Sequence, residues 1–414
     1  MDTIRLIHAA DLHLGFTGNT SLVHNIGHPA VGRPIREVDI EEAVKWLTRS
    51  IRSADPPIDV LLIAGDLFHR SVPLPRTVAF AARFIHRIVE HGVDVVIIDG
   101  NHEVASATDI GSPTGYLREL GAHVVNIPQY SVIRDNEWRN PRLQGRLAVH
   151  ALAYQMIQEG DFTGVSPLPG CLNVLLSHGR VHGMDDLNSL HRTSSWIPAH
   201  ILRQPWDYIA LGDWHIHRYQ PLGDTPAYYA GSIEALNFGE ASWYPDRRDD
   251  AYAIRGVLDA RLATSKPVEV LSIPYNGRRP VLRLSPIDAA ELEPSELMDA
   301  LRKRLSNQLP AEALVLLDVR SCPAHIRDQL DFVEIDQLRQ RVLRCEIRWD
   351  IVRPEQSQSA ESPSEESLTD QWKEFLAQQI PEEAERTWFL AEGSARIDAA
   401  RSRILSAQAN AGKE

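Results

Sequence analysis

Cysteine and long apolar runs are scarce in this chain of 414 residues. Its three cysteines, Cys171, Cys322 and Cys345, are widely spaced, so they predict neither a disulfide framework nor a thiolate metal site and fit a reducing compartment. No apolar run approaches the ~20 residues that a membrane-spanning helix needs. The N-terminus lacks a basic region before an apolar stretch, so we expect no export signal. These absences favour a cytoplasmic protein without membrane contact.

An excess of positive charge is also absent, since the formal net charge at pH 7 is −13. This argues mildly against a protein that coats itself with nucleic acid. Bound divalent metal ions would change the local sign of the charge where a substrate binds, so the net charge leaves the partner open. The hydrophobic fraction of 43% is typical of a globular protein.

Short aliphatic runs alternate with helical patterns over residues 1–260, which predicts an α/β layered domain. The expected helices are residues 38–51 and 75–92, with Gly92 as the stop signal of the second helix. The expected strands are residues 4–10, 59–65, 93–100, 146–154, 172–179 and 207–212.

Composition divides the rest of the chain into three parts. Residues 261–352 continue the alternation and predict a smaller α/β domain. Residues 353–367 are rich in Ser, Pro and Glu without periodicity, which predicts a flexible linker. Residues 368–410 carry apolar residues at helical spacing, Trp372 and Leu376 among them, and predict a tail of amphipathic helices.

Side chains that can bind metal recur just after the expected strands. The carboxyl ends of strands in an open α/β sheet form the crevice where functional groups collect, so we expect these side chains to meet at one rim. His215 and His217 lie two residues apart, and in extended backbone their side chains would point to the same side. The residues are Asp11, His13, Asp66, His69, Asn101, His102, His178, His215 and His217.

Oxygen and imidazole donors without cysteine favour Mn²⁺, Fe²⁺ or Zn²⁺ over Ca²⁺ or Mg²⁺. The set is too large for one ion, and the carboxylate of Asp66 would divide it in two by bridging two ions. Two ions ~3.5–4 Å apart generate a nucleophile from water near neutral pH and stabilise the charge that develops on a phosphoryl group. The sequence therefore predicts a two-metal phosphoester hydrolase.

The ordered motifs D-x-H, G-D, G-N-H, a lone His and H-x-H resemble those of the calcineurin-like metallophosphoesterase superfamily. DLHLG, GDLFH and YYAGSIEALNFGE (228–240) more narrowly resemble the Mre-eleven/SbcD nucleases of DNA double-strand break processing. The motifs span residues 5–240, and beyond residue 260 the likeness is one of layout only. The resemblance implies a layered β-sandwich flanked by helices, with residues 261–352 as a capping and DNA-binding domain.

The resemblance also implies roles for the motif residues. His102 would protonate the leaving oxygen or contact the scissile phosphate, and His69 would help to seat the nucleic acid strand. One metal ion would be held by Asp11, His13, Asp66 and His217. The other metal ion would be held by Asp66, Asn101, His178 and His215.

Two departures from the family pattern add residues of interest. The usual G-H-x-H is here G-D-W-H-I-H, so Asp213 becomes a candidate partner for a histidine ring. The usual G-N-H-D is here G-N-H-E, and Glu103 is expected to do the same orienting work through a longer arm. In GSIEALNFGE, Ser232 either lies on a loop that lines the nuclease site or caps the N-terminus of a helix.

The leading hypothesis is a Mn²⁺-dependent DNA exonuclease or endonuclease that acts in end processing, repair or defence against foreign DNA. The resemblance further implies a homodimer that works with a coiled-coil ATPase of the SbcC type, gripped by the C-terminal helices. Those helices could equally pack on their own domain. Two alternatives stay open: a small-nucleotide phosphodiesterase, which the acidic net charge favours, and a scaffold subunit of an ATPase complex.

Overall fold

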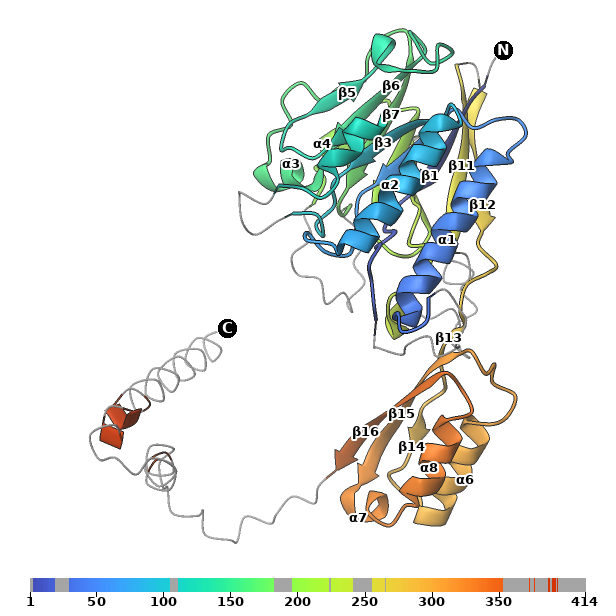
Figure 1. The fold of residues 1–414 in the computed structure, drawn as a ribbon, viewed down its shortest axis with the longest axis vertical. Helices are drawn as coiled ribbons and strands as arrows, with labels where there is room; N and C mark the ends of the chain where they lie inside the picture. Colours follow the sequence, from blue (N-terminus) through green and yellow to red (C-terminus); the bar gives the residue numbers. More distant parts are fainter. Residues whose placement is uncertain are drawn as a thin grey trace. The chain divides into compact units, whose positions relative to one another are not determined.

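The computed structural model describes residues 3–18, 30–104, 111–181, 196–222, 225–240, 255–264 and 266–352, with eight helical residues beyond 370. The chain forms one compact unit over residues 1–351 and a second unit over residues 352–414. Figure 1 shows the first unit and labels most of its helices and strands.

Two six-stranded sheets form the larger part of the first unit. In the first sheet the order is β12-β11-β1-β2-β3-β4. Strands β1 to β4 run parallel, and β11 and β12 are antiparallel additions. The bounds are β1 (Ile4–Ala9), β2 (Val60–Ala64), β3 (Asp94–Ile98), β4 (His123–Val125), β11 (Gly256–Ala263) and β12 (Lys266–Pro274).

The second sheet has the order β5-β6-β7-β8-β10-β9. Its central strands β6, β7, β8 and β10 are parallel, and β5 and β9 are antiparallel at the edges. The bounds are β5 (Ser131–Ile133), β6 (Leu147–Leu152), β7 (Leu172–His178), β8 (Tyr208–Gly212), β9 (Arg218–Leu222) and β10 (Thr225–Tyr229).

Apolar side chains fill the space between the two sheets, with Leu62 and Val96 from the first meeting Val174 and Leu176 from the second. Because these strands are buried on both faces, they read as continuous aliphatic runs. Helices α1 (Ile35–Arg52) and α2 (Pro75–Glu90) cover the other face of the first sheet, and α3 (Tyr154–Glu159) and α4 (Ala199–Leu202) pack against the second. The expected layered sandwich flanked by helices is confirmed.

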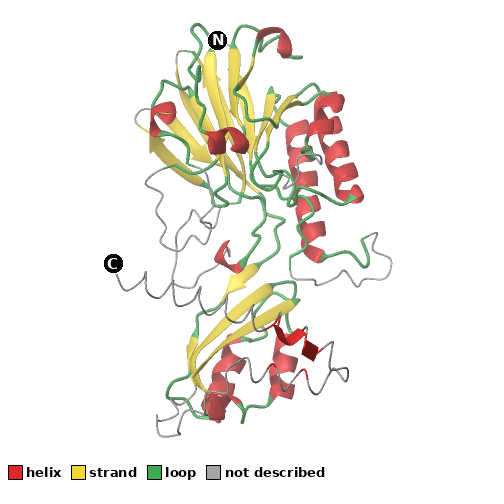
Figure 2. Cartoon of the chain, turned by 90° about the vertical axis from the view of Figure 1, so that its left-hand side faces the viewer, coloured by secondary structure: helices red, strands yellow, loops and turns green. Residues whose placement is uncertain are grey.

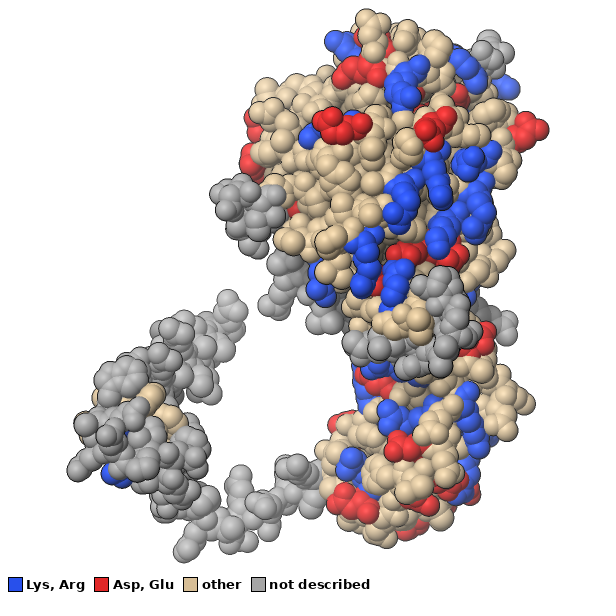
Figure 3. Space-filling view, in the orientation of Figure 1, with Lys and Arg blue, Asp and Glu red and all other residues tan. Residues whose placement is uncertain are grey.

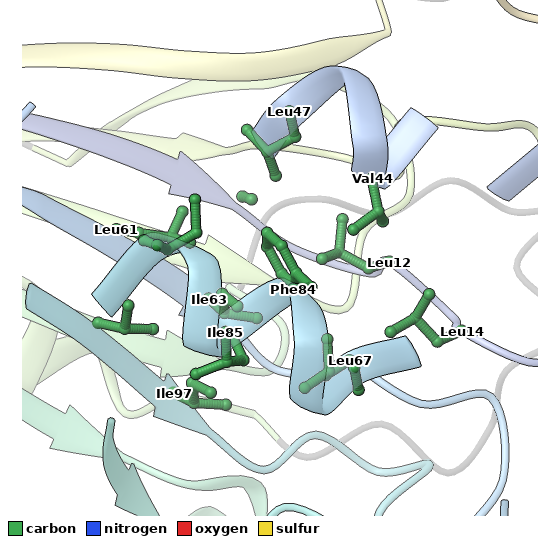
Figure 4. Packing of buried hydrophobic residues seen from close by; sticks show 14 of the residues in the cluster. Leu12, Leu14, Val44, Leu47, Leu61, Ile63, Leu67, Phe84, Ile85 and Ile97 are labelled. Atoms are coloured by element: carbon green, nitrogen blue, oxygen red, sulfur yellow. The ribbon is translucent and has the colours of Figure 1, made fainter. Parts of the chain in front are cut away.

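Helix α2 shows how local sequence fixes the elements. It begins at Pro75, where a missing N–H costs no hydrogen bond, and ends before Gly92, whose φ of 85° only glycine adopts easily. Its buried side, including Phe84 and Ile85, packs on Ile63 and Ile97 of the sheet, as Figure 4 shows. Three short 3₁₀ helices complete this part: η1 (Gly115–Leu120), η2 (Asp135–Glu137) and η3 (Phe238–Glu240).

The domain boundary expected at residue 260 falls inside β11. Strand β11 pairs with β1 from Ile4–Leu262 to His8–Leu258, and β12 pairs with β11. The hairpin therefore belongs to the first sheet, although the run at 268–273 was expected in the second domain. The division of the chain into functional domains stays a prediction.

A smaller sheet with its own core follows the hairpin. Strand β15 lies between β13 and β14 in the sheet order and also pairs with β16. Leu297 and Leu301 of α6 pack against Val315 and Leu317 of β15. The bounds are β13 (Val281–Arg283), β14 (Ile287–Asp288), α6 (Pro294–Arg304), β15 (Leu314–Pro323), α7 (Ala324–Arg327), α8 (Phe332–Arg339) and β16 (Arg344–Val352).

The linker predicted over residues 353–367 lies outside the described residues. Within the predicted helical tail, each residue that the structure describes is helical. There the indole N–H of Trp372 donates to the carbonyl oxygen of Phe389 at 3.2 Å. Among the described residues, no helix has the length and apolar character needed to cross a membrane.

Candidate metal centre

The loops that follow the parallel strands carry the candidate site. Asp11 and His13 follow β1, and their backbone N–H groups donate to the carbonyl oxygens of Gly65 and Asp66 at 3.1 and 2.9 Å. These hydrogen bonds hold the loops after β1 and β2 side by side. Asn101 and His102 follow β3, His178 ends β7, and His215 and His217 lie between β8 and β9.

Two groups of donor atoms come together, each with its atoms within 4.8 Å of one another. The first group is Asp11, His13, Asp66 and His215. The second group is His13, His69 and His102.

Asp66 stands between two sets of imidazoles. Its Oδ2 lies 3.5 Å from Nε2 of His13, and its Oδ1 lies 3.6 Å from Nε2 of His178. The same nitrogen of His178 is 3.0 Å from Oδ1 of Asn101. The two carboxylate oxygens therefore face different donors, so Asp66 would be able to hold two cations.

Several site residues adopt left-handed backbone conformations. The φ angles of Asp11, His13 and Asp66 are 51°, 47° and 51°, and that of Asp213 is 92°. Aspartate and histidine enter this region more readily than most side chains, but each such residue still costs about 1–3 kcal/mol. Strain of this kind is concentrated at functional sites, where the surrounding structure holds it in place.

Hydrogen bonds donated by Nδ1–H orient two of the histidine rings. The Nδ1–H of His178 donates to the carbonyl oxygen of Ala64 at 2.8 Å, and that of His215 donates to Oε1 of Glu240 at 3.0 Å. Burial lowers the pKa of His215, but the Glu240 carboxylate outweighs it and the pKa rises to about 9. Both rings direct Nε2 into the site, as a metal ligand must.

The donors fit a divalent cation. Burial raises the pKa of Asp11 to about 7, and its Oδ2 is buried without a hydrogen-bond partner among the described residues. A buried carboxylate oxygen of this kind is stabilised strongly by a bound cation. Burial and then the neighbouring imidazoles lower the pKa of His13, which keeps it neutral and able to ligate. Nitrogen and oxygen donors without sulfur suit Mn²⁺, Fe²⁺ or Zn²⁺.

His217 is a predicted ligand that lies outside both donor groups. Its ring centroid is 6.4 Å from that of Tyr228, whereas Nε2 of His215 lies 3.1 Å from Nε2 of His13. The rule that residues i and i+2 share a side holds for extended strands. Here β8 ends at Gly212 and β9 begins at Arg218, so the two histidines lie on a loop and point differently. Among the described residues, His215 is the histidine of this pair that is grouped with Asp11, His13 and Asp66, and the role of His217 as a ligand stays a prediction.

Glu103 joins the loops after β2 and β3. Its buried carboxylate accepts hydrogen bonds from the backbone N–H groups of Phe68, Gly100 and Asp66 at 2.7, 2.8 and 3.2 Å. These contacts fix the backbone on both sides of the metal-facing carboxylate. Glu103 therefore has the contacts of a residue that orients the metal ligands and does not itself bind metal.

Asp213 and Ser232 support other parts of the centre. The N–H of Asp213 donates to Oδ1 of Asp11 at 3.1 Å, and its carboxylate lies 3.9 Å from Nε2 of His178. No helix begins at Ser232, because the described backbone from 231 to 237 has no helical residue. Its buried hydroxyl instead donates to the carbonyl oxygen of Glu234 at 2.8 Å.

His102 and His69 lie at the open side of the centre. The Nδ1–H of His102 donates to the carbonyl oxygen of His69 at 2.8 Å, and its Nε2 lies 3.9 Å from Oδ2 of Asp66. The two rings stack with centroids 5.1 Å apart. Burial, followed by the charge of His102, lowers the pKa of His69 to about 4. The side chain of His102 is 31% exposed, so a substrate can reach it.

Glu240 and Arg255 have supporting roles that the sequence did not predict. Arg255 is buried and donates to the carbonyl oxygens of His215, Ser232 and Glu240 at 3.1, 3.1 and 2.7 Å. Glu240 closes the motif at 228–240, which is the one signal the sequence offers. No spacing rule connects it with a histidine 25 residues earlier, because the contact is made by loops.

A Glu240→Gln variant is expected to bind Mn²⁺ about 10- to 100-fold more weakly, as is usual when the partner of a ligating histidine is lost. Glutamine keeps the volume of the side chain but removes the negative charge that makes the His215 ring basic. Isothermal titration with Mn²⁺ measures the affinity. Glu234→Gln is the matched control, since Glu234 is buried and pairs with Arg36 instead. Equal affinities in the two variants would contradict the role given to Glu240.

Several known proteins have sequences similar to part of this chain. The chain is 27% identical over 248 residues to the DNA double-strand break repair protein Mre11 of Methanopyrus kandleri, a match that covers 57% of this chain and 50% of that protein. It is 26% identical over 267 residues to Mre11 of Archaeoglobus fulgidus, covering 61% and 55%. It is 24% identical over 266 residues to the SbcD component of the nuclease SbcCD of Escherichia coli, covering 57% and 62%.

The match to relatives is confined to one part of each protein. The aligned region spans about half the length of the Mre11 proteins. A family model described as calcineurin-like phosphoesterase matches residues 4–218, a segment that runs from β1 through the loop with His215 and His217 and makes up more than half of the chain. The chain belongs to the calcineurin-like phosphoesterase family.

Proposed function

We propose that this chain is a metal-dependent nuclease that hydrolyses the phosphodiester bonds of DNA during end processing or repair. The observation that carries the proposal is the position of Asp66, whose two oxygens face His13 and His178 at 3.5 and 3.6 Å. Two bound ions, Mn²⁺ by preference and otherwise Fe²⁺ or Zn²⁺, would supply a nucleophile from water near neutral pH and stabilise charge on the phosphate.

His102 is proposed to act on the leaving oxygen or the scissile phosphate. Its Nδ1–H is engaged by the carbonyl oxygen of His69, so the ring orientation is fixed and Nε2 faces the site beside Asp66. A proton on Nε2 can then be donated to an oxygen within hydrogen-bond reach. His69 supports this position through its backbone and stacked ring.

A cavity of about 410 Å³ beside His69 supports a nucleic acid substrate. Its lining includes Phe16 and Arg70 from the loops of the first sheet and Arg344 and Arg348 from β16. Guanidinium groups bind phosphate well, and aromatic rings offer a surface on which a base can stack. The contribution of β16 fits the proposed DNA-binding role of residues 261–352.

The same cavity favours a second candidate, a phosphodiesterase for a small nucleotide. A volume of about 410 Å³ lies in the range of pockets that enclose small ligands. Purified protein with Mn²⁺ should be offered linear duplex DNA, single-stranded DNA and short dinucleotides. Cleavage of the DNA substrates is expected. Hydrolysis of the dinucleotides alone would overturn the nuclease proposal in favour of this second function.

A His102→Ala variant is expected to retain its metal ions and to cleave DNA about 100-fold more slowly, the lower range for loss of a positioned acid or base. Metal content and the cleavage rate are measured on the same preparation. His86→Ala serves as control, because His86 is an exposed histidine of α2 that faces Glu90 at 3.2 Å. Loss of the metal ions in the His102 variant would assign this residue to the ligands.

We also propose a homodimer that works with a coiled-coil ATPase. The similarity to a protein named as one component of the nuclease SbcCD supports a further component here, and the helical residues near Trp372 are candidates for its docking. Co-purification with such an ATPase is the test. The clustered donors argue against a scaffold whose metal site is secondary, and cleavage that appears only in the complex would favour such a scaffold.

A further inference from the structure

The outer surface of helices α1 and α2 concentrates basic side chains. Lys45, Arg49 and Arg52 are spaced four and three residues apart on α1 and so share one side of that helix. Arg83 and Arg87 are spaced four apart on α2, and together with Lys45 they line a groove of about 200 Å³ between the helices. Figure 3 shows Lys and Arg gathered over this face. We call these five residues the α1–α2 basic patch.

Most charges of the patch are not paired locally, since Glu41, the one acidic residue that lines the groove, pairs with Arg33. Arg49, Arg52, Arg83 and Arg87 are exposed, and none forms an ion pair with another described residue. Lys45 pairs with Glu42 at 2.7 Å, but both side chains are more than 40% exposed, and such pairs contribute little. A cluster of like charges repels itself, so its presence in a protein of net charge −13 favours a negatively charged partner.

The patch lacks the apolar centre of a protein-binding surface. Protein interfaces are built around buried aromatic or aliphatic anchors. Among the described residues of α1 and α2, no large apolar side chain is exposed, and the exposed Val31, Val72 and Leu74 precede the two helices. Binding to a chain of phosphates needs cations without an apolar anchor. The chemistry of this face therefore fits a polyanion better than a folded protein.

We propose that the α1–α2 basic patch binds the phosphate backbone of duplex DNA as a second contact, apart from the metal centre. From Lys45 to Arg52 the helix advances about 10 Å, the length of about three base pairs. The exposed guanidinium groups are suited to phosphate and carry no base-specific arrangement. The contact is therefore independent of sequence. The proposal rests on the proposed DNA substrate, although it concerns a different surface.

The start of α2 connects the patch with the metal centre. Thr77 packs so closely against the loop after β1 that a Cβ on Gly15 would lie 3.1 Å from its Cγ2. This loop also carries His13. Arg83 and Arg87 lie two to three turns further along the same helix. Duplex DNA held on the patch would therefore extend from these arginines toward the metal centre.

The test compares two triple variants of the full chain. R49Q/R83Q/R87Q removes three charges from the patch, and R134Q/R139Q/R203Q removes three exposed arginines elsewhere. Binding to a fluorescent 30-base-pair duplex is measured by anisotropy in EDTA at several salt concentrations. In the patch variant the magnitude of the slope of log K against log salt concentration is expected to decrease by about 2 to 3. The affinity for the duplex at 0.1 M salt is expected to fall about 10-fold. The control variant is expected to keep the wild-type slope.

Hydrolysis of the small ester bis(p-nitrophenyl) phosphate with Mn²⁺ separates this proposal from the nuclease proposal. The patch variant is expected to hydrolyse it at the wild-type rate, since no patch residue belongs to the metal centre. An unchanged salt slope, or an equal loss in the control variant, overturns the patch, and so does loss of ATPase binding with duplex binding intact. A wild-type protein that binds duplex DNA through the patch but cleaves none would support the patch and refute the nuclease.

Discussion

An Asp66→Asn variant is expected to cleave DNA on the order of 10³-fold more slowly and to lose at least one bound metal ion. This loss of rate is at the upper end of that seen when a single charge-stabilising hydrogen-bond donor is removed from an active site. The carboxylate presents one oxygen to His13 and the other to His178 at 3.5 and 3.6 Å. An amide has one oxygen and no charge, so it would hold two cations far more weakly than the carboxylate. Asparagine tolerates the φ of 51° at this position, which keeps the fold intact. Metal analysis and cleavage assays in Mn²⁺ give the two readouts.

Asp94→Asn is the matched control for Asp66. Asp94 is also a buried aspartate of the first sheet, but its carboxylate accepts backbone hydrogen bonds from Arg139 and Asn140 at 3.2 and 2.9 Å. The control is expected to lose some stability and to keep both metal ions and its cleavage rate per folded molecule. An Asp66→Asn protein with wild-type metal content and rate would remove the bridging role and with it the two-metal proposal.

Several strands that the sequence predicted are buried on both faces. Strands β2, β3 and β7 are buried along their whole length and carry aliphatic runs, because each lies between two apolar layers. Strand β11 escaped prediction because Asp259 and Arg261 interrupt its apolar pattern. The structure explains the interruption, since Asp259 pairs with Arg5 of β1 at 2.7 Å. A contact between residues 254 positions apart leaves no local signal.

The sequence predicts which candidate ligands lie close together better than it predicts which metal ion each of them would bind. Residues that follow parallel strands reach the same rim whatever the loops do, and Asp11, Asp66 and His178 lie close together. The orientation of His215 and His217 depends on a loop held by Glu240 and Arg255. Loop contacts of this kind follow no periodicity, and the structure was needed to find them.

The geometry of the metal centre also depends on the glycine at position 100. A Cβ there would collide with Oδ1 of Asp66 and lie 2.6 Å from its backbone nitrogen, closer than real Cβ atoms approach. The N–H of Gly100 also donates to Glu103 at 2.8 Å, which ties the residue to the same loop. The close approach of the loops after β2 and β3 thus depends on the absence of a side chain.

A Gly100→Ala variant is therefore expected to bind Mn²⁺ too weakly to measure and to cleave DNA on the order of 10³-fold more slowly, because Asp66 must leave its bridging position. Titration with Mn²⁺, the cleavage rate and the unfolding temperature are measured together. Gly115→Ala is the control, since the nearest atom to its Cβ would be Nδ2 of Asn126 at 3.3 Å, the end of a movable side chain. If Gly100→Ala bound Mn²⁺ and cleaved DNA like the control, the packing of these loops would not determine the geometry of the centre.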